Sequence, residues 1–200
     1  MQTALLLILV VCILIIGFIF SRELKHSRRL AMTDTLTSLP NRFSLFNLVD
    51  EFNHENRSFN LFLLDLNGFK QVNDQFGHQV GDGALIEVAK RLNSIRMTKA
   101  HAFRIGGDEF AVVVPENEVL SADDFCKALE QVFQQPFKHE DIRYELSTSI
   151  GFANFPEDSD DIDELIRHAD QRMYQMKFSH RDKKKNNAIV NNLCDLYLLG

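Results

Sequence analysis

The pattern of apolar and polar positions predicts a mixture of helices and strands. The almost wholly apolar run over 59–66 is typical of a strand covered on both faces, at the centre of a sheet. Residues 142–152 alternate with a period of two, which predicts a strand with one buried face. Helices are predicted, mainly from apolar residues at helical spacing, over 42–53, 69–76, 83–96, 121–136 and 162–178.

Two glycines followed by two acids interrupt a second apolar run. The flanking segments, 101–105 and 110–114, are rich in β-branched and aromatic residues and predict two strands joined by a tight turn. The glycine pair 106–107 is expected to supply the positive φ angles that such a turn demands. Asp108 and Glu109 would then lie on a stiff two-stranded support. They could hold a metal ion there, or they could simply be solvated.

A further carboxylate lies at the end of the apolar strand. Burying Asp65 would cost free energy unless another group paired with it, which makes it a second candidate for chemistry. An ordinary turn residue is the alternative, because Asn67 and Gly68 follow directly.

An amide and a carboxylate flank the next turn. Asn73 lies in the short helix that Gly77 is expected to stop, and Asp82 is predicted to cap the helix that begins at Gly83. Together they could pair with the edge of a guanine, whose N1–H and N2 amino group are donors and whose O6 is an acceptor. Most Asn and Asp residues in such segments only cap helices and turns.

The charge and the cysteines exclude some classes of protein. The net charge is −6, which argues against an electrostatic nucleic-acid binder. Cys12, Cys126 and Cys194 are scattered, which argues against a disulfide framework and against zinc, and fits a reducing compartment.

The N-terminal segment predicts a membrane anchor. Residues 1–21 carry no charged side chain, and the run over 4–20 reaches the lower end of the roughly 17–25 residues that span a bilayer. No basic residues precede it and no small-residue cleavage site follows, so an uncleaved anchor is favoured over a signal peptide. Basic residues come next, at Arg22, Lys25, Arg28 and Arg29. By the positive-inside rule we expect a single-pass protein of the inner (cytoplasmic) membrane, with everything after Arg22 in the cytoplasm.

Six blocks in a fixed order resemble the GGDEF domain, the diguanylate cyclase family, over roughly 31–190. The blocks are Asp34-x-Leu36-Thr37-x-Leu39-x-Asn41-Arg42, Asp65-Leu66-Asn67-Gly68-Phe69-Lys70-x-x-Asn73-Asp74, Phe76-Gly77-His78-x-x-Gly81-Asp82, Arg104-x-Gly106-Gly107-Asp108-Glu109-Phe110, Ser149-Ile150-Gly151 and Ala169-Asp170-x-x-Met173-Tyr174-x-x-Lys177. Together they are far more specific than the Gly-Gly-Asp-Glu-Phe signature alone.

The resemblance implies an α/β (α+β) fold: a central, mainly antiparallel sheet flanked by helices, like nucleotidyl cyclases and the polymerase palm. Together with the apolar N-terminal run, it divides the chain into an anchor (1–21), a helical linker (22–33), a GGDEF domain (34–190) and a tail of unknown role (191–200). It implies an enzyme that condenses two GTP molecules into cyclic di-GMP and two pyrophosphates, as a homodimer. The alternative is a non-catalytic GTP- or cyclic-di-GMP-binding regulatory domain on the same fold.

The resemblance also implies a metal centre. The Asp65 and Asp108 side chains would be ligands of two Mg²⁺ (or Mn²⁺) ions, with help from the Leu66 carbonyl. Glu109, the second signature acid, would tune the metals or contact the attacking 3′-hydroxyl.

Roles in nucleotide binding follow from the same resemblance. Asn73 and Asp82 would bind guanine. The side chains expected to hold the β- and γ-phosphates are those of Lys70, Lys177 and Arg181. The backbone amides around Phe69 and Lys70, at a helix start, would assist them.

Three departures from the family pattern bear on these expectations. Asn67 stands where many relatives carry a second Asp, and the segment 180–182 keeps only the arginine of the usual Gly-Arg-Asn. Many relatives carry an Arg-x-x-Asp product-binding site before the signature, and the matching residues here are Met97-Thr98-Lys99-Ala100. We therefore expect no feedback inhibition by cyclic di-GMP through that site.

Overall fold

The computed structural model describes residues 13–20, 22, 31–95, 99–118 and 121–177. The helices are α2 (Arg42–His54), α3 (Phe69–Phe76), α4 (His78–Asn93), the 3₁₀ helix η1 (Glu116–Glu118), α5 (Ala122–Val132) and a last helix over 162–177. The strands are β1 (Phe59–Asn67), β2 (His101–Arg104), β3 (Glu109–Pro115), β4 (Phe137–His139), β5 (Ile142–Tyr144) and β6 (Ser147–Phe155). Most of the expected linker, the segment that contains Arg181, and the tail lie outside the described residues.

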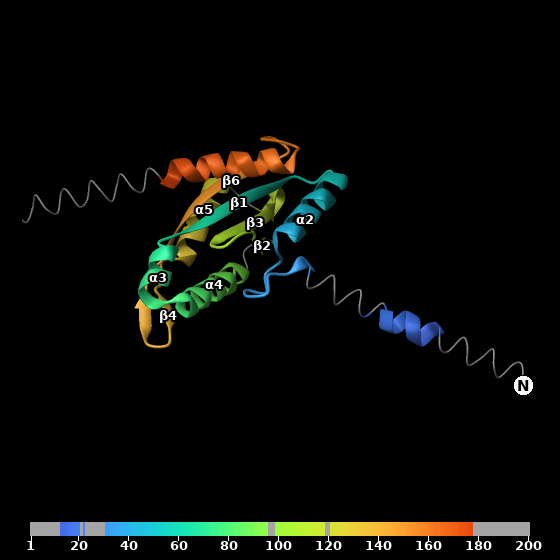
Figure 1. The fold of residues 1–200 in the computed structure, drawn as a ribbon. Helices are drawn as coiled ribbons and strands as arrows, with labels where there is room; N and C mark the ends of the chain where they lie inside the picture. Colours follow the sequence, from blue (N-terminus) through green and yellow to red (C-terminus); the bar gives the residue numbers. More distant parts are fainter. Residues whose placement is uncertain (1–12, 21, 23–30, 96–98, 119–120, 178–200) are drawn as a thin grey trace, which may run out of the picture.

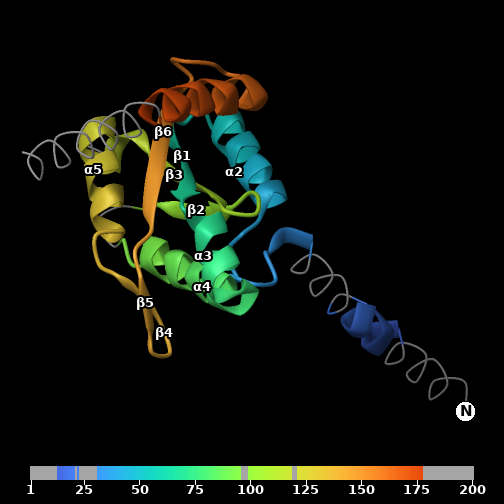
Figure 2. The same cartoon turned by 60° about the vertical axis from the view of Figure 1, so that its left-hand side comes forward.

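An antiparallel four-stranded sheet in the order β2-β3-β1-β6 forms the centre of the domain (Figures 1 and 2). Strand β1 pairs with β3 from Phe59↔Pro115 to Asp65↔Glu109, and with β6 from Phe59↔Phe155 to Asn67↔Ser147. The apolar run of β1 therefore lies between two neighbours, as predicted. The antiparallel α+β fold, with helices on both sides of the sheet, is confirmed.

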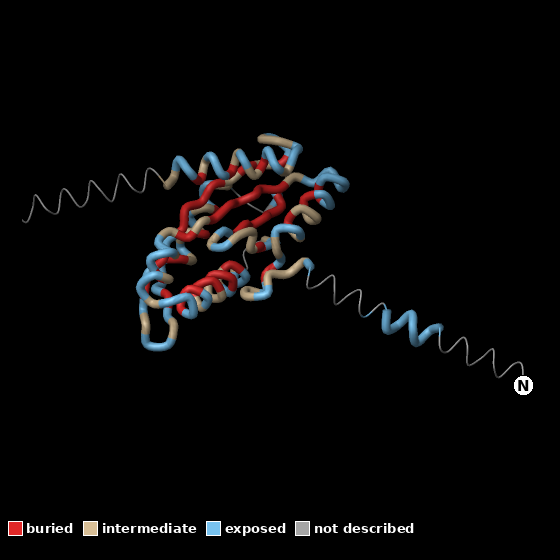
Figure 3. Tube along the Cα trace, viewed as in Figure 1, coloured by how far each residue is buried: buried red, intermediate tan, exposed pale blue. Residues whose placement is uncertain are grey.

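The sheet separates two hydrophobic cores, because alternate residues of β1 point to opposite faces. Phe62, Leu64 and Leu66 pack on one face against α3, α4 and α5. Leu61 and Leu63 pack on the other face against α2 and the last helix. Buried residues fill the strands while the outer sides of the helices stay exposed (Figure 3). Strand β1 is thus packed on both sides over most of its length.

The predicted strand over 142–152 is wrong in two respects. It is divided into β5, which forms a separate hairpin with β4, and β6, which joins the main sheet. The alternation continues through the break because Tyr144 and Leu146 are both buried in the same core. Strand β6 is also covered on both faces, since Ile150 lies in one core and Ala153 in the other. The hairpin of β4 and β5 was not predicted.

Helix α4 begins five residues earlier than predicted. Gly77, with a φ of 87°, serves as both the C-cap of α3 and the N-cap of α4. The amides of Val80 and Gly81 already donate to the Gly77 carbonyl, at 3.2 and 3.3 Å. Asp82 is therefore not an N-cap: it lies within the second turn of α4.

The expected anchor is described only in part. Residues 13–20 are helical and their apolar side chains are exposed, with Phe18 and Ile16 each 66% accessible. Across the described ranges, no helix combines the length and the apolar character needed to cross a membrane.

Candidate functional site

The signature acids lie beside Asp65, where the end of β1 meets the start of β3. Asp65 is directly opposite Glu109 in the strand register. One residue further on, the Leu66 amide donates to the Asp108 carbonyl oxygen at 3.3 Å. Asp65 and Asp108 are half-buried and Glu109 is exposed. The pairing of two strands thus brings Asp65 beside two carboxylates that lie more than 40 positions further along the chain.

The glycine pair has a different role from the one predicted. Among the described glycines only Gly68 and Gly77 have positive φ, so the turn does not require it at positions 106 and 107. A Cβ on Gly106 would instead lie 2.6 Å from Oε2 of Glu109, whereas one on Gly107 would meet nothing within 4 Å. The Glu109 carboxylate therefore lies against Gly106 in this structure.

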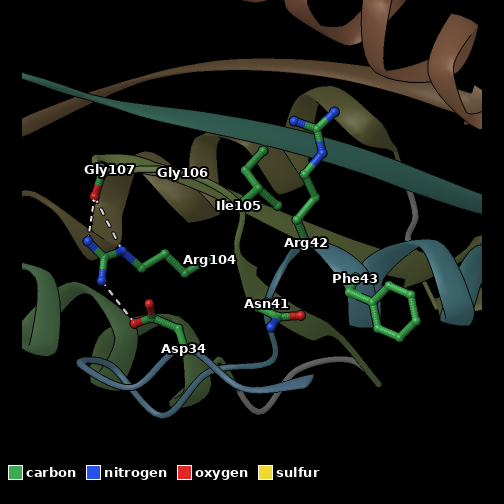
Figure 4. Close-up of a pocket in the computed structure, with 8 residues that line it drawn as sticks. All are labelled: Asp34, Asn41, Arg42, Phe43, Arg104, Ile105, Gly106 and Gly107. Carbon is green, nitrogen blue, oxygen red and sulfur yellow. Dashed lines mark hydrogen bonds and ion pairs between the residues drawn. The ribbon is translucent and has the colours of Figure 1, made fainter. Parts of the chain in front are cut away.

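Arg104 links the glycine turn to Asp34, which precedes α2. Its Nε and Nη2 atoms donate to the Gly107 carbonyl oxygen at 3.3 and 2.8 Å, while Nη1 forms an ion pair with Asp34 Oδ1 at 2.9 Å (Figure 4). The same Asp34 oxygen accepts from the Thr37 amide at 2.8 Å and from its hydroxyl at 2.6 Å. Burial raises the pKa of Asp34, but the hydrogen bonds from Thr37 and then Arg104 outweigh it and hold that pKa below its usual value. The residues before α2 are thereby tied to the turn that carries Asp108.

This ion pair predicts a pH-dependent contribution to stability. Asp34→Asn removes the charge, and we expect its free energy of unfolding at pH 7 to be lower than that of the native chain by about 1–2 kcal/mol. Because the folded-state pKa is lowered, the contribution is complete above the unfolded-state pKa of about 3.9 and is lost as the pH falls through the folded-state value. Urea unfolding between pH 7 and pH 3 measures the difference. Asp50→Asn, on an exposed position of α2, is the control; a gap for Asp34→Asn that stays constant over this range would contradict the assignment.

Lys177 contacts Asp65 in this structure. Its Nζ atom lies 2.7 Å from Asp65 Oδ1, and the two side chains are 28% and 18% exposed. The sequence predicted a phosphate contact for Lys177 and did not foresee this ion pair, which joins the end of the last helix to β1.

Asn67 faces Ser149 on β6, with its Nδ2 atom 3.0 Å from the Ser149 hydroxyl. The departure at position 67 is therefore accommodated by a neighbouring strand.

The two predicted guanine-binding residues come from adjacent helices. A Cβ on Gly81 would lie only 1.9 Å from Oδ1 of Asn73, so the Asn73 carboxamide rests on α4 next to Asp82. Asn73 is half-buried and Asp82 is exposed. Lys70 is exposed in the first turn of α3, whose N-cap Gly68 makes no side-chain capping bond.

An open cavity of about 410 Å³ lies on one side of the glycine turn. It is lined by Asp34, Asn41, Arg42, Phe43, Arg104, Ile105, Gly106 and Gly107 (Figure 4). None of the residues predicted from the sequence to bind metal or nucleotide lines it. Within the described ranges, no three His, Cys, Asp or Glu side chains gather as a ready-made metal cluster.

Comparison with known proteins identifies the family. A family model described as "Diguanylate cyclase, GGDEF domain" matches residues 31–183. The chain belongs to this family. It is 39% identical over 165 residues to signaling protein YkoW of Bacillus subtilis, covering 80% of this chain and 21% of that protein. It is 36% identical to diguanylate cyclase DgcP of Escherichia coli over 76% of this chain and 46% of that one. The chain thus spans less than half the length of these relatives.

Solved structures share the fold. The coiled coil and GGDEF domain of DgcB from Caulobacter crescentus, in complex with c-di-GMP, superposes with a TM-score of 0.68 at 28% identity, over 80% of this chain and 87% of that one. A sensory box/GGDEF family protein from the same organism gives a TM-score of 0.66 at 32% identity, over 74% and 99% of the two chains.

The sequence did not assign roles to Asp34 and Arg104. Both belong to blocks that resemble the family, at the start of two different blocks. Their opposite charges would allow an ion pair, but only the fold shows that the two side chains meet. The isolated bridge between Asn41 and Arg104 brings the two segments together.

Proposed function

We propose that the chain is a diguanylate cyclase that joins two GTP molecules into cyclic di-GMP with release of two pyrophosphates. The observation that carries the proposal is the alignment of Asp65, Asp108 and Glu109 at the shared end of β1 and β3. Asn73 and Asp82 lie on the two helices that follow β1, as a binding site for one guanine would require. The relatives DgcP and DgcN of Escherichia coli are themselves named diguanylate cyclases.

The donor groups fit magnesium or manganese. Two carboxylates and a backbone carbonyl, from Asp65, Asp108 and Leu66, offer only oxygen, which is the ligand type that these ions prefer. Mg²⁺ is commonly held by one or two carboxylates together with substrate phosphates, so a cluster of three acidic side chains is not needed. Asp65 already accepts a cation, the Lys177 ammonium, at 2.7 Å. Two bound ions would lower the pKa of the 3′-hydroxyl and neutralise charge on the phosphates.

The chain's own residues position the nucleotide. The Asp82 carboxylate accepts from N1–H and the N2 amino group of guanine, and Asn73, against Gly81, adds an amide beside it. Lys70 and the amides of Phe69 and Lys70, at the start of α3, face the phosphates, together with Lys177. Arg181, outside the described residues, would add a second cation. Arg104 supports the acidic turn by donating to the Gly107 carbonyl oxygen at 2.8 Å.

Assembly and location complete the proposal. One GTP per domain requires two domains to face each other, so the active form is a homodimer. Residues 1–21 anchor the chain in the cytoplasmic membrane, with the catalytic domain on the cytoplasmic side. Cyclic di-GMP does not inhibit through 97–100, because the Arg-x-x-Asp charges are absent there.

The test is turnover by the full chain. Incubation with GTP and Mg²⁺ or Mn²⁺ is expected to yield one cyclic di-GMP and two pyrophosphates per two GTP consumed, with no product from ATP. Removal of the metal with EDTA is expected to stop the reaction. An artificially dimerised chain is the control for a sample that is silent because it is monomeric. GTP binding without product in that dimer would instead support the non-catalytic regulatory domain.

A further inference from the structure

The β4–β5 hairpin projects from the sheet and lies beside α3 and α4 (Figures 1 and 2). These two helices carry Asn73 and Asp82, and the hairpin contributes no residue to the proposed nucleotide site. Three separate contacts hold it there: an arginine on α4, a series of aromatic rings that leads to α3, and a histidine against α4.

Arg91 on α4 makes the first contact. Its guanidinium donates to three carbonyl groups in the segment before β4: Val132 at 3.1 Å, Gln135 at 2.8 Å and Pro136 at 3.1 Å. Its Nε atom pairs with Glu87 at 3.0 Å, and its guanidinium carbon lies 3.9 Å from the centre of the Phe137 ring. Only 15% of the side chain is exposed. An arginine that only faces solvent would donate most of these hydrogen bonds to water. Arg91 donates them to the protein instead and so holds the hairpin in place.

Aromatic rings form the second contact. Phe137 on β4 stacks on Tyr144 on β5 with centroids 5.9 Å apart, and Tyr144 contacts Phe76 at the end of α3 at 6.2 Å. The buried Tyr144 hydroxyl has no hydrogen-bond partner among the described residues. Burial, and then the charge of Glu87, raise the pKa of Tyr144. Tyr144 therefore acts here as an uncharged ring that connects the hairpin to α3.

The third contact lies next to the proposed guanine site. A Cβ on Gly83 would be 2.5 Å from Nδ1 of His139, so the imidazole rests on the α4 backbone one residue after Asp82. On the other side, Asn73 rests on Gly81, one residue before Asp82. The glycines on either side of Asp82 in the sequence are thus covered by one side chain from α3 and one from the hairpin.

We propose that Arg91 is a positioning residue for guanine: by fixing the β4–β5 hairpin against α3 and α4, it sets the relative placement of Asn73 and Asp82. The inference rests on the proposed function, because it takes these two residues as the guanine-binding pair. A carboxylate and an amide discriminate between bases by hydrogen bonding only when both side chains are aligned with the edge of the base. Loosening the hairpin then weakens recognition of guanine without removing any group that touches it.

The test compares GTP with inosine triphosphate, which lacks only the N2 amino group. Equilibrium binding of both to the full chain is measured in EDTA, so that turnover does not interfere. Arg91→Lys keeps the charge and loses the planar set of donors. We expect its affinity for GTP to fall by about tenfold and the preference for GTP over inosine triphosphate to fall by about fivefold, as bonds to N2 are lost. In turnover assays KM for GTP rises while kcat at saturation stays within about twofold.

Matched variants separate positioning from general stability. Arg57→Lys is the control, because Arg57 also pairs with a glutamate (Glu55, 2.8 Å) and stacks on a phenylalanine (Phe52, 4.1 Å), beside α2. It is expected to keep the native nucleotide preference. Tyr144→Phe keeps the ring and is expected to bind GTP normally. Phe137→Leu is a second probe of the hairpin, should Arg91→Lys not fold, and is expected to lower the preference in the same direction.

The native chain and its variants have three distinguishable outcomes. If folded Arg91→Lys and Phe137→Leu lose thermal stability but keep the native preference, the positioning role is refuted and the proposed function is untouched. If the native chain itself binds both nucleotides equally, the assignment of Asn73 and Asp82 fails and the inference fails with it. If the native chain prefers GTP and the variants lose the preference, while cyclic di-GMP is never formed, the inference holds and the catalytic proposal does not.

Discussion

We expect Asp108→Ala to abolish the proposed synthesis of cyclic di-GMP, with a loss of about 10³-fold or more in kcat and little change in fold. Asp108 precedes β3 and its side chain is half-buried, so truncation removes no part of either core. The backbone bond from the Leu66 amide to its carbonyl, at 3.3 Å, survives the change. What is lost is one of the two carboxylates available for divalent ions, and charge stabilisation of this kind is usually the largest contribution to catalysis.

The measurement is product formation by the full chain over a range of Mg²⁺ concentrations. Asp50→Ala, on the exposed side of α2, removes the same charge away from the site and is expected to keep native turnover. Circular dichroism checks that both variants are folded. Full turnover by Asp108→Ala would exclude this carboxylate from the metal site and leave Asp65 and Glu109 as its acidic groups.

Local patterns were sufficient for the elements that depend on local physics. The apolar run of β1 required cover on both faces and received it from two cores. Asn41 caps α2 by accepting from the Ser44 amide at 3.2 Å, and Ser121 caps α5 by accepting from the Asp124 amide at 3.1 Å. The acidic turn and Asp65 were singled out separately, each as a charge where an apolar strand ends. Strand pairing then brought them together.

The features that were missed depend on partners distant in the chain. The glycine pair predicts positive φ at the acidic turn, whereas neither Gly106 nor Gly107 has it. Positive φ occurs at Gly77 instead, which shortens the connection between α3 and α4 and moves Asp82 into a helix. The period-two pattern over 142–152 does not reveal that its first part leaves the main sheet. The ion pair between Lys177 and Asp65 joins residues 112 positions apart, which no local pattern could indicate.

Gly151→Ala is expected to give the largest loss of stability of any glycine-to-alanine change among the described glycines, because only there would the added Cβ overlap backbone atoms. Gly151 lies in β6 beneath the last helix, and Figure 1 shows that helix running alongside the strand. A Cβ there would lie 2.0 Å from the Ala169 carbonyl oxygen, 2.4 Å from the Met173 amide nitrogen and 2.7 Å from the Met173 Cβ. Two of these atoms are helix backbone, so no side-chain rotation relieves the clash. We expect the free energy of unfolding to fall by about 3 kcal/mol or more.

Urea unfolding of the full chain measures this loss, with Gly107→Ala as the control because a Cβ at that position meets nothing within 4 Å.

The last helix also bears Lys177, which pairs with Asp65. Moving this helix away from β6 therefore changes the acidic site as well. Gly151→Ala is therefore expected to reduce turnover even at temperatures where it remains folded, whereas an ordinary destabilised variant regains native activity on cooling. A stability within about 0.5 kcal/mol of the native chain would show that the helix shifts freely on the sheet, and Lys177 would then not be fixed by packing.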